Sequence, residues 1–152
     1  MNDRSERTIE DFLSYKLSLL SRLINRRSTR YFAEEFSMTL AEWRCLVQIA
    51  ENLGCTVRDI SERTYADKGQ ISRAAQDLVT KGLIVGKSDP LDRRSVRYKV
   101  TPKGKAMFQS IFALRKAENQ AVVDLLTPHQ SRVFLECLDL LMAKFAHDET
   151  SS

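Results

Sequence analysis

Apolar residues recur every three or four positions near the beginning of the chain, which is the spacing of one face of an α-helix. This pattern predicts a helix over residues 8–31. Thr8 followed three residues later by Asp11 is suited to cap its start, because their side chains can satisfy the free backbone N–H groups there. The apolar positions of this helix are Ile9, Phe12, Leu13, Leu17, Leu20, Leu23 and Ile24.

Three shorter helices are predicted in the middle of the chain. Residues 39–42, Thr-Leu-Ala-Glu, form a capping box that opens a helix ending near Gly54. Residues 56–59 and 67–70 carry similar start signals, each followed by apolar residues at helical spacing. Gly82 follows Lys81 and predicts the end of the third of these helices.

Two strands and two further helices complete the pattern. Residues 83–85 and 97–100 are short and β-prone, and the polar, proline-containing segment between them predicts a turn. Thr-Pro pairs then open a helix over 102–125 and a last helix that ends near residue 146. The sequence therefore predicts a mainly α fold with a small β-hairpin, an α+β class.

Much apolar surface lies at the two ends of the chain. The central helices are too short to cover both terminal helices, so we expect a second copy of the chain to cover them. An ordinary bundle within one chain is the alternative. The residues predicted to form the dimer interface are Phe12, Leu13, Leu17, Leu20, Val133, Phe134, Leu138, Leu141 and Phe145.

The excess positive charge is concentrated in one segment. Residues 56–104 hold 11 Lys or Arg against 6 Asp or Glu, whereas the whole chain holds 24 against 20. Such a concentration indicates a surface that faces phosphates. The alternative is a solvent-exposed face on which positive charges cluster by chance.

The predicted helix over 67–81 has a polar face suited to the major groove of DNA. Gln and Arg side chains can form paired hydrogen bonds with adenine and guanine edges, so Gln70 and Arg73 are the candidates for reading bases. Lys68 and Ser72 suit phosphates, Gly69 allows close backbone approach, and Gln76 suits either role. A solvated helix face is the competing interpretation of each residue. The predicted contacts are Lys68, Gly69, Gln70, Ser72, Arg73 and Gln76.

The connection between the strands carries a second group of candidates. Arginines at a hairpin tip can enter the narrow, negatively charged minor groove beside a major-groove site. We place Arg94 at the tip, with Arg93 and Arg97 on phosphates. Asp92 is interpreted as the local partner that orients an arginine.

Residues 92–104, Asp-Arg-Arg-Ser-Val-Arg-Tyr-Lys-Val-Thr-Pro-Lys-Gly, resemble the wing signature of the MarR (multiple antibiotic resistance regulator) family. In that signature a D-x-R tip is followed by a strand ending in LT-x-x-G, and Val100 stands where the family usually has Leu. Residues 67–73 and 78–84 resemble its recognition helix and the strand that follows, and 42–44 the start of its second helix. The resemblance spans about residues 8–146 and is most specific in the central third.

The resemblance implies one MarR-like unit over residues 1–152. It implies dimerisation helices over 8–36 and 102–147 and a winged helix-turn-helix lobe over 39–101. It further implies a homodimer that binds double-stranded DNA at a pseudo-palindromic operator, usually as a repressor released by a small ligand or an oxidant. The two recognition helices would then read major grooves one turn, about 34 Å, apart.

An effector site is predicted from the same resemblance, at the junction between the dimerisation helices and the DNA-binding lobe. Tyr31 and Trp43 would supply aromatic walls and Arg44 a cation, which suits an anionic aromatic ligand. The alternative for Trp43 is a hydrophobic staple with Met38 at a helix start.

A thiol trigger is the competing possibility. The peroxide-sensing branch of the family has a reactive cysteine in the first helix, but no cysteine precedes Cys45 here. Cys55 is expected to be the most exposed of the three thiols.

Other classes fit less well. The cysteine and histidine spacing favours neither a disulfide scaffold nor a metal site, and no cofactor is expected. Enzyme motifs such as GxSxG and HExxH are absent from the sequence. No apolar run reaches the roughly 20 residues that a membrane span needs, and a cytoplasmic location is expected. A winged-helix module that binds protein instead of DNA remains open.

Overall fold

The computed structural model describes residues 8–52, 54–90, 92 and 94–150, with side chains to residue 147. The chain divides into two compact units, Met1–Phe108 and Gln109–Ser152. The predicted mainly α fold with a β-hairpin is confirmed, whereas the interpretation of the whole chain as one unit stays a prediction.

The first unit begins with a short 3-10 turn, η1 (Ile9–Asp11), followed by the long helix α1 (Leu13–Phe36). The predicted Thr8–Asp11 capping box is present, but it caps η1, because the extended backbone at Phe12 separates η1 from α1. The helix α1 also runs past Tyr31 and ends at Ser37, whose φ of 48° stops the helical path.

Three short helices follow, and each starts at the cap that the sequence predicts. They are α2 (Leu40–Glu51), α3 (Val57–Thr64) and α4 (Lys68–Thr80). The hydroxyl oxygens of Thr39 and Thr56 and a carboxylate oxygen of Asp67 accept from backbone N–H groups three residues on, at 3.1, 3.1 and 2.8 Å. These bonds satisfy N–H groups that have no partner within the helix.

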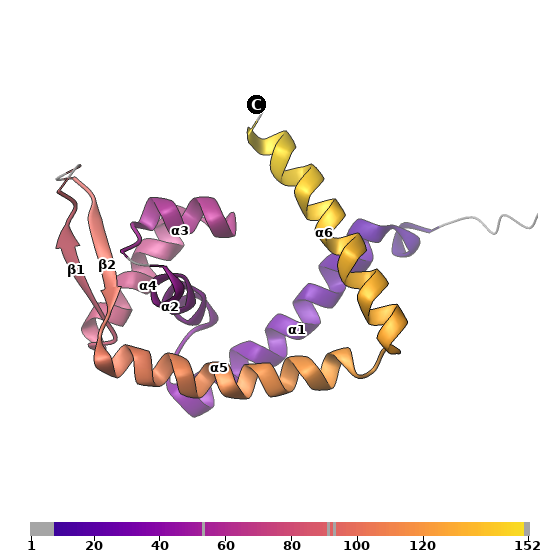
Figure 1. The fold of residues 1–152 in the computed structure, drawn as a ribbon, viewed down its shortest axis with the longest axis horizontal. Helices are drawn as coiled ribbons and strands as arrows, with labels where there is room; N and C mark the ends of the chain where they lie inside the picture. The colour runs from indigo at the N-terminus through magenta and orange to yellow at the C-terminus, as the bar shows by residue number, and fades with distance from the viewer. Residues whose placement is uncertain (1–7, 53, 91, 93, 151–152) are drawn as a thin grey trace, which may run out of the picture. The chain divides into compact units, whose positions relative to one another are not determined.

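Strands β1 (Ile84–Ser88) and β2 (Val96–Val100) form an antiparallel hairpin at one edge of this unit, next to α4 (Figure 1). In its register, Ile84 pairs with Val100 and Ser88 with Val96, so the hairpin is longer than the sequence pattern predicts. The backbone N–H of Tyr98 donates to the carbonyl of Cys55 at 2.8 Å, which holds β2 against the turn before α3.

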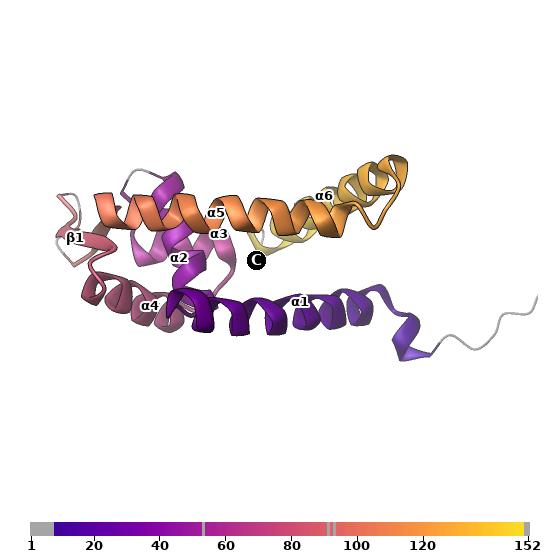
Figure 2. The same ribbon diagram turned by 90° about the horizontal axis from the view of Figure 1, so that it is seen from below.

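The core of the first unit is aromatic and aliphatic. The indole of Trp43 is only 8% exposed and stacks with Phe32 at 5.5 Å and Phe108 at 5.9 Å between ring centroids. Figure 2 shows the C-terminal end of α1 beside α2 and α4. The helix α1 therefore contributes one end to this core. The buried apolar residues of the three central helices are Trp43, Cys45, Leu46, Ile49, Ile60, Ile71, Ala74, Ala75 and Leu78.

Helix α5 (Pro102–Val123) starts tightly against the hairpin. The backbone N–H of Thr101 donates to the carbonyl of Leu83 at 3.0 Å, and the Thr101 hydroxyl accepts from the N–H of Gly104 at 3.0 Å. A Cβ atom added at Gly104 would lie 1.9 Å from the Leu83 carbonyl oxygen. Only glycine fits at this position.

The second unit contains the rest of α5 and the helix α6 (Pro128–Thr150). Thr127 and Gln130 cap α6 reciprocally, at 3.0 and 3.3 Å, as the sequence predicts. The helix continues past residue 146. Among the described residues, we find no helix with the length and apolar character to span a membrane.

Candidate nucleic-acid interface

Helix α4 turns one face to its own core and the opposite face outward. Ile71, Ala74, Ala75 and Leu78 are buried and hold the helix against α2 and α3. The six residues that the sequence assigns to DNA lie on the other side. Lys68, Gly69, Gln70, Arg73 and Gln76 are exposed, and Ser72 is half-buried.

The outward side chains of α4 are largely uncommitted. Within the described part of the chain, no hydrogen bond or ion pair holds the side chains of Lys68, Arg73 or Gln76. At about 1.5 Å per residue the 13-residue helix is roughly 20 Å long, a suitable length for a major groove. This face can therefore exchange water for base edges and phosphates without breaking contacts in the protein.

Asp92 shapes the wing turn. Its carboxylate accepts from the backbone N–H of Arg94 at 3.0 Å and from the hydroxyl of Ser95 at 2.9 Å. The aspartate thus fixes the main chain at Arg94, whereas the sequence suggested a partner for an arginine side chain. Arg94 itself is exposed, and Arg93 lies outside the described residues.

Arg97 is held at the base of the wing by two contacts. Its Nε lies 2.6 Å from Oδ2 of Asp89, and its guanidinium also donates to the carbonyl of Gly54 at 2.8 Å. Asp89 is only 4% exposed, and its backbone N–H donates to the carbonyl of Ser95 at 2.9 Å. This geometry favours a wing-positioning role for Arg97, and its contact with phosphate stays a prediction.

Sequence reasoning missed three residues of this region. Asp89 is the buried carboxylate that holds Arg97, and only its position before Pro90 hinted at a turn. Lys87 and Lys99 are exposed on the two strands of the hairpin. Lys87 pairs with Arg97 in the strand register, so the hairpin adds positive charge next to α4.

The comparisons with known proteins agree with this geometry. Residues 36–95 match the model of the MarR family, a stretch that runs from the end of α1 into the wing. Over this stretch the chain is similar to the MarR family. No curated protein sequence matches the chain.

Solved structures share the fold over most of the chain. The transcriptional regulator SlyA is 23% identical with a TM-score of 0.81, over 92% of this chain and 99% of that one. MepR from S. aureus, solved as a DNA complex, is 18% identical with a TM-score of 0.78, over 88% and 98%. A MarR family regulator from Listeria monocytogenes, complexed with a 26mer DNA, is 20% identical with a TM-score of 0.81, over 90% and 91%.

The MarR-like effector residues are only partly brought together. Trp43 and Arg44 line a cavity of about 360 Å³, and the Arg44 guanidinium donates to Oδ1 of Asn25 at 2.9 Å. Tyr31 packs edge-on against Phe32 and Phe36 instead, with ring centroids 6.1 and 5.7 Å apart. The burial of Trp43 fits the staple interpretation as well. The remaining residues of the cavity wall are Val47, Gln48, Thr64, Ala66, Gln70 and Ile71.

The cysteines of this MarR-like chain differ from expectation. Cys55 was expected to be the most exposed thiol, but it is only 2% exposed, because the pairing with Tyr98 covers its turn; its thiol contacts the carbonyls of Gln48 and Asn52. Cys137 is the exposed one. Burial raises the pKa of Cys45 to about 12, and burial also raises the pKa of Cys55 despite the nearby guanidinium of Arg63. Neither buried thiol is set up as a thiolate at neutral pH.

Proposed function

We propose that this protein is a sequence-specific DNA-binding transcriptional regulator that acts as a homodimer on a pseudo-palindromic operator. The observation that carries the proposal is the outward polar face of α4 together with an exposed Arg94, whose backbone N–H donates to the carboxylate of Asp92. In this proposal Gln70 and Arg73 read bases, and Lys68 and Ser72 bind phosphates. Arg94 enters the flanking minor groove.

The homodimer is supported by exposed apolar side chains on α1, at Phe12 just before it, and on α6. Phe12 is 53% exposed, Phe134 is 43% exposed and Phe145 is 67% exposed. Leaving this much apolar surface in water is unfavourable, and a second copy of the chain offers the same apolar helices in return. The other predicted interface residues are exposed or half-buried: Leu13, Leu17, Leu20, Val133, Leu138 and Leu141.

A titration of labelled duplex from upstream of the protein's own gene tests the function. We expect two chains per duplex and an affinity that falls steeply with salt, because each neutralised phosphate releases about 0.9 counterion. Several such contacts give a log–log slope of about −5 or steeper. A winged-helix module that binds protein would not bind this duplex even at about 50 mM salt. That outcome, or a stable monomer in sedimentation, would contradict the proposal.

We further propose that the protein is a repressor and that a small anionic aromatic effector releases it from DNA. The cavity beside Trp43 and Arg44 supports it, because the wall includes Gln70 of the DNA-facing helix. A ligand there would disturb a base-reading residue directly.

The effector site can be tested by fluorescence, since Trp43 is the single tryptophan of the chain. We expect benzoate to change the emission of Trp43 and to weaken DNA binding, whereas neutral benzamide should do neither. The variant Arg44→Met should abolish the benzoate response, because it removes the cation that the carboxylate needs. Equal responses to both compounds would contradict an anion site.

A further inference from the structure

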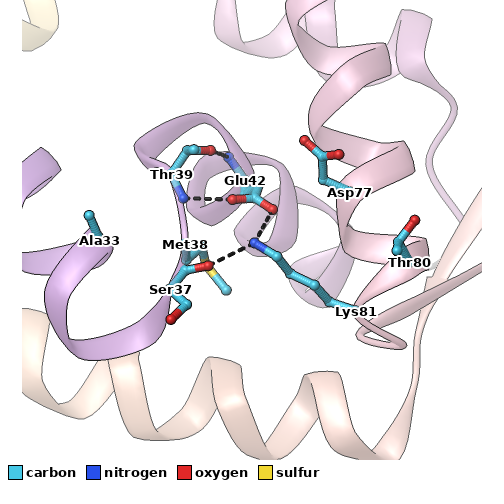
Figure 3. A pocket seen from close by; sticks show the side chains of 8 residues that line it. All are labelled: Ala33, Ser37, Met38, Thr39, Glu42, Asp77, Thr80 and Lys81. Carbon is cyan, nitrogen blue, oxygen red and sulfur yellow. Dashed lines mark hydrogen bonds and ion pairs between the residues drawn. The ribbon is translucent and has the colours of Figure 1, made fainter.

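Lys81, the residue that follows α4, lies where several helices meet. Its Nζ donates to Oε1 of Glu42 at 2.5 Å and to the carbonyl of Ser37 at 2.8 Å (Figure 3). We call Ser37, Glu42 and Lys81 the clasp. It ties the end of α1 and the start of α2 to the end of α4. An open crevice beside it is lined further by Ala33, Met38, Thr39, Asp77 and Thr80.

Each member of the clasp is fixed by other contacts. Glu42 is only 1% exposed, and its second carboxylate oxygen accepts from the backbone N–H of Thr39 at 2.6 Å. Ser37 has a left-handed backbone, and its N–H donates to the carbonyl of Phe32, so it ends α1 at a fixed position. The carbonyl of Lys81 accepts from Nζ of Lys103 at 2.8 Å, so the first turn of α5 is joined to the same residue.

The Glu42 carboxylate is charged and dependent on its partner. Burial alone raises its pKa, but the hydrogen bond from Lys81, the bonds to Thr39 and the charge of Lys81 outweigh this and lower the pKa below the ordinary value of 4.5. At neutral pH the clasp is therefore an ion pair with one member out of water. Removing Lys81 would leave that carboxylate buried and unpaired, so the helix ends would have to move to let water reach it.

We infer that Lys81 is a positioning residue, which sets the angle of the recognition helix α4 relative to the dimerisation helix α1. This inference rests on the proposed function. In a dimer the two α4 helices must lie one turn of DNA apart. Since α1 contributes to the predicted dimer interface, the angle between α1 and α4 fixes that separation. The clasp thus determines which spacing between operator half-sites the dimer accepts.

A direct phosphate contact is the competing role for Lys81, because its side chain is 38% exposed. Salt dependence separates the two roles. Loss of a phosphate contact lowers the log–log slope by about 0.9, whereas loss of a positioning contact leaves the number of released counterions unchanged.

The experiment compares Lys81→Met, Lys81→Arg and the double variant Glu42→Gln/Lys81→Met with the unaltered protein. The double variant leaves no buried unpaired charge, so it is expected to fold even if Lys81→Met does not. Lys116→Met, at an exposed lysine of α5, is the matched control. Each protein is titrated with the operator and with the same duplex lengthened by two base pairs at its centre. All titrations are run at several salt concentrations, on the proteins that thermal unfolding shows to be folded at the working temperature.

For Lys81→Met and the double variant, we expect about tenfold weaker binding to the operator. The ratio of the affinities for the operator and for the lengthened duplex should fall by the same factor, and the salt slope should stay unchanged. Lys81→Arg should retain most of the discrimination, because arginine can donate to both partners. Unchanged discrimination, or a slope lowered by about 0.9, would overturn the inference. Failure of the unaltered protein to bind the operator would instead refute the proposed function.

Discussion

Replacing Gly104 by alanine is expected to lower the free energy of unfolding by about 3 kcal/mol, near the upper end of what overpacking usually costs. The added Cβ would lie 1.9 Å from the carbonyl oxygen of Leu83 and 2.8 Å from its carbon. That carbonyl already accepts from the backbone N–H and the hydroxyl of Thr101 at 3.0 and 3.1 Å, so it cannot retreat without breaking the start of α5. Urea unfolding followed by circular dichroism measures the loss.

Gly82→Ala provides the control for Gly104→Ala. Gly82 has a left-handed φ of 69° but an open surrounding, with no atom within 4 Å of an added Cβ. Its replacement should cost only about 1 kcal/mol, the cost of the left-handed backbone. If Gly104→Ala proved no more destabilising than Gly82→Ala, the close packing of α5 on the hairpin would be wrong.

Replacing Arg73 by alanine is expected to weaken operator binding by about 1–3 kcal/mol, roughly 5- to 150-fold, while binding to unrelated DNA changes little. The reason is that the substitution removes a guanidinium that makes two hydrogen bonds with one guanine edge, so only that base pair is affected. Gln70→Ala should act in the same way at another base pair. Fluorescence anisotropy with operator and scrambled duplexes measures both affinities.

Lys68→Ala is the comparison for Arg73→Ala, because Lys68 lies on the same exposed face but is assigned to a phosphate. It should weaken operator and scrambled DNA alike and lower the salt slope by about 0.9. Were Arg73→Ala to show this uniform pattern, Arg73 would be a phosphate contact and base reading would have to lie elsewhere on α4.

The parts of the fold that the sequence predicted depend on neighbouring residues. Thr39 with Glu42, Thr56 with Asp59 and Thr127 with Gln130 each exchange hydrogen bonds over three positions. Such bonds depend on local backbone geometry alone, so a single sequence contains all the information they need. The outward face of α4 was predictable for a similar reason, because its apolar spacing defines the opposite face.

The contacts that the sequence did not predict join residues far apart in the chain. Lys81 reaches Glu42 across 39 positions and Ser37 across 44. Arg97 reaches Gly54 across 43 positions, and this contact holds a residue that we had assigned to DNA. Cys55 looked exposed because a turn usually is, yet the pairing of Tyr98 with Cys55 covers that turn. Only tertiary packing decides such cases.

Some assignments depend on a partner and not on the chain alone. The apolar residues of α1 and α6 were recognisable from helical spacing. Their exposure to solvent is explained only when a second copy of the chain covers them. In the same way, Arg94 is exposed at the wing, and the DNA groove that it is proposed to enter defines its role.

Hydroxyl-radical footprinting of the operator complex tests the central claim most directly. We expect two protected stretches related by a dyad, on one face of the duplex and one turn, about 34 Å, apart. Protection should extend into the flanking minor grooves and be lost there, and only there, in Arg94→Ala. A single protected stretch, or a footprint that Arg94→Ala leaves unchanged, would contradict a dimer that reads DNA with two α4 helices and two wings.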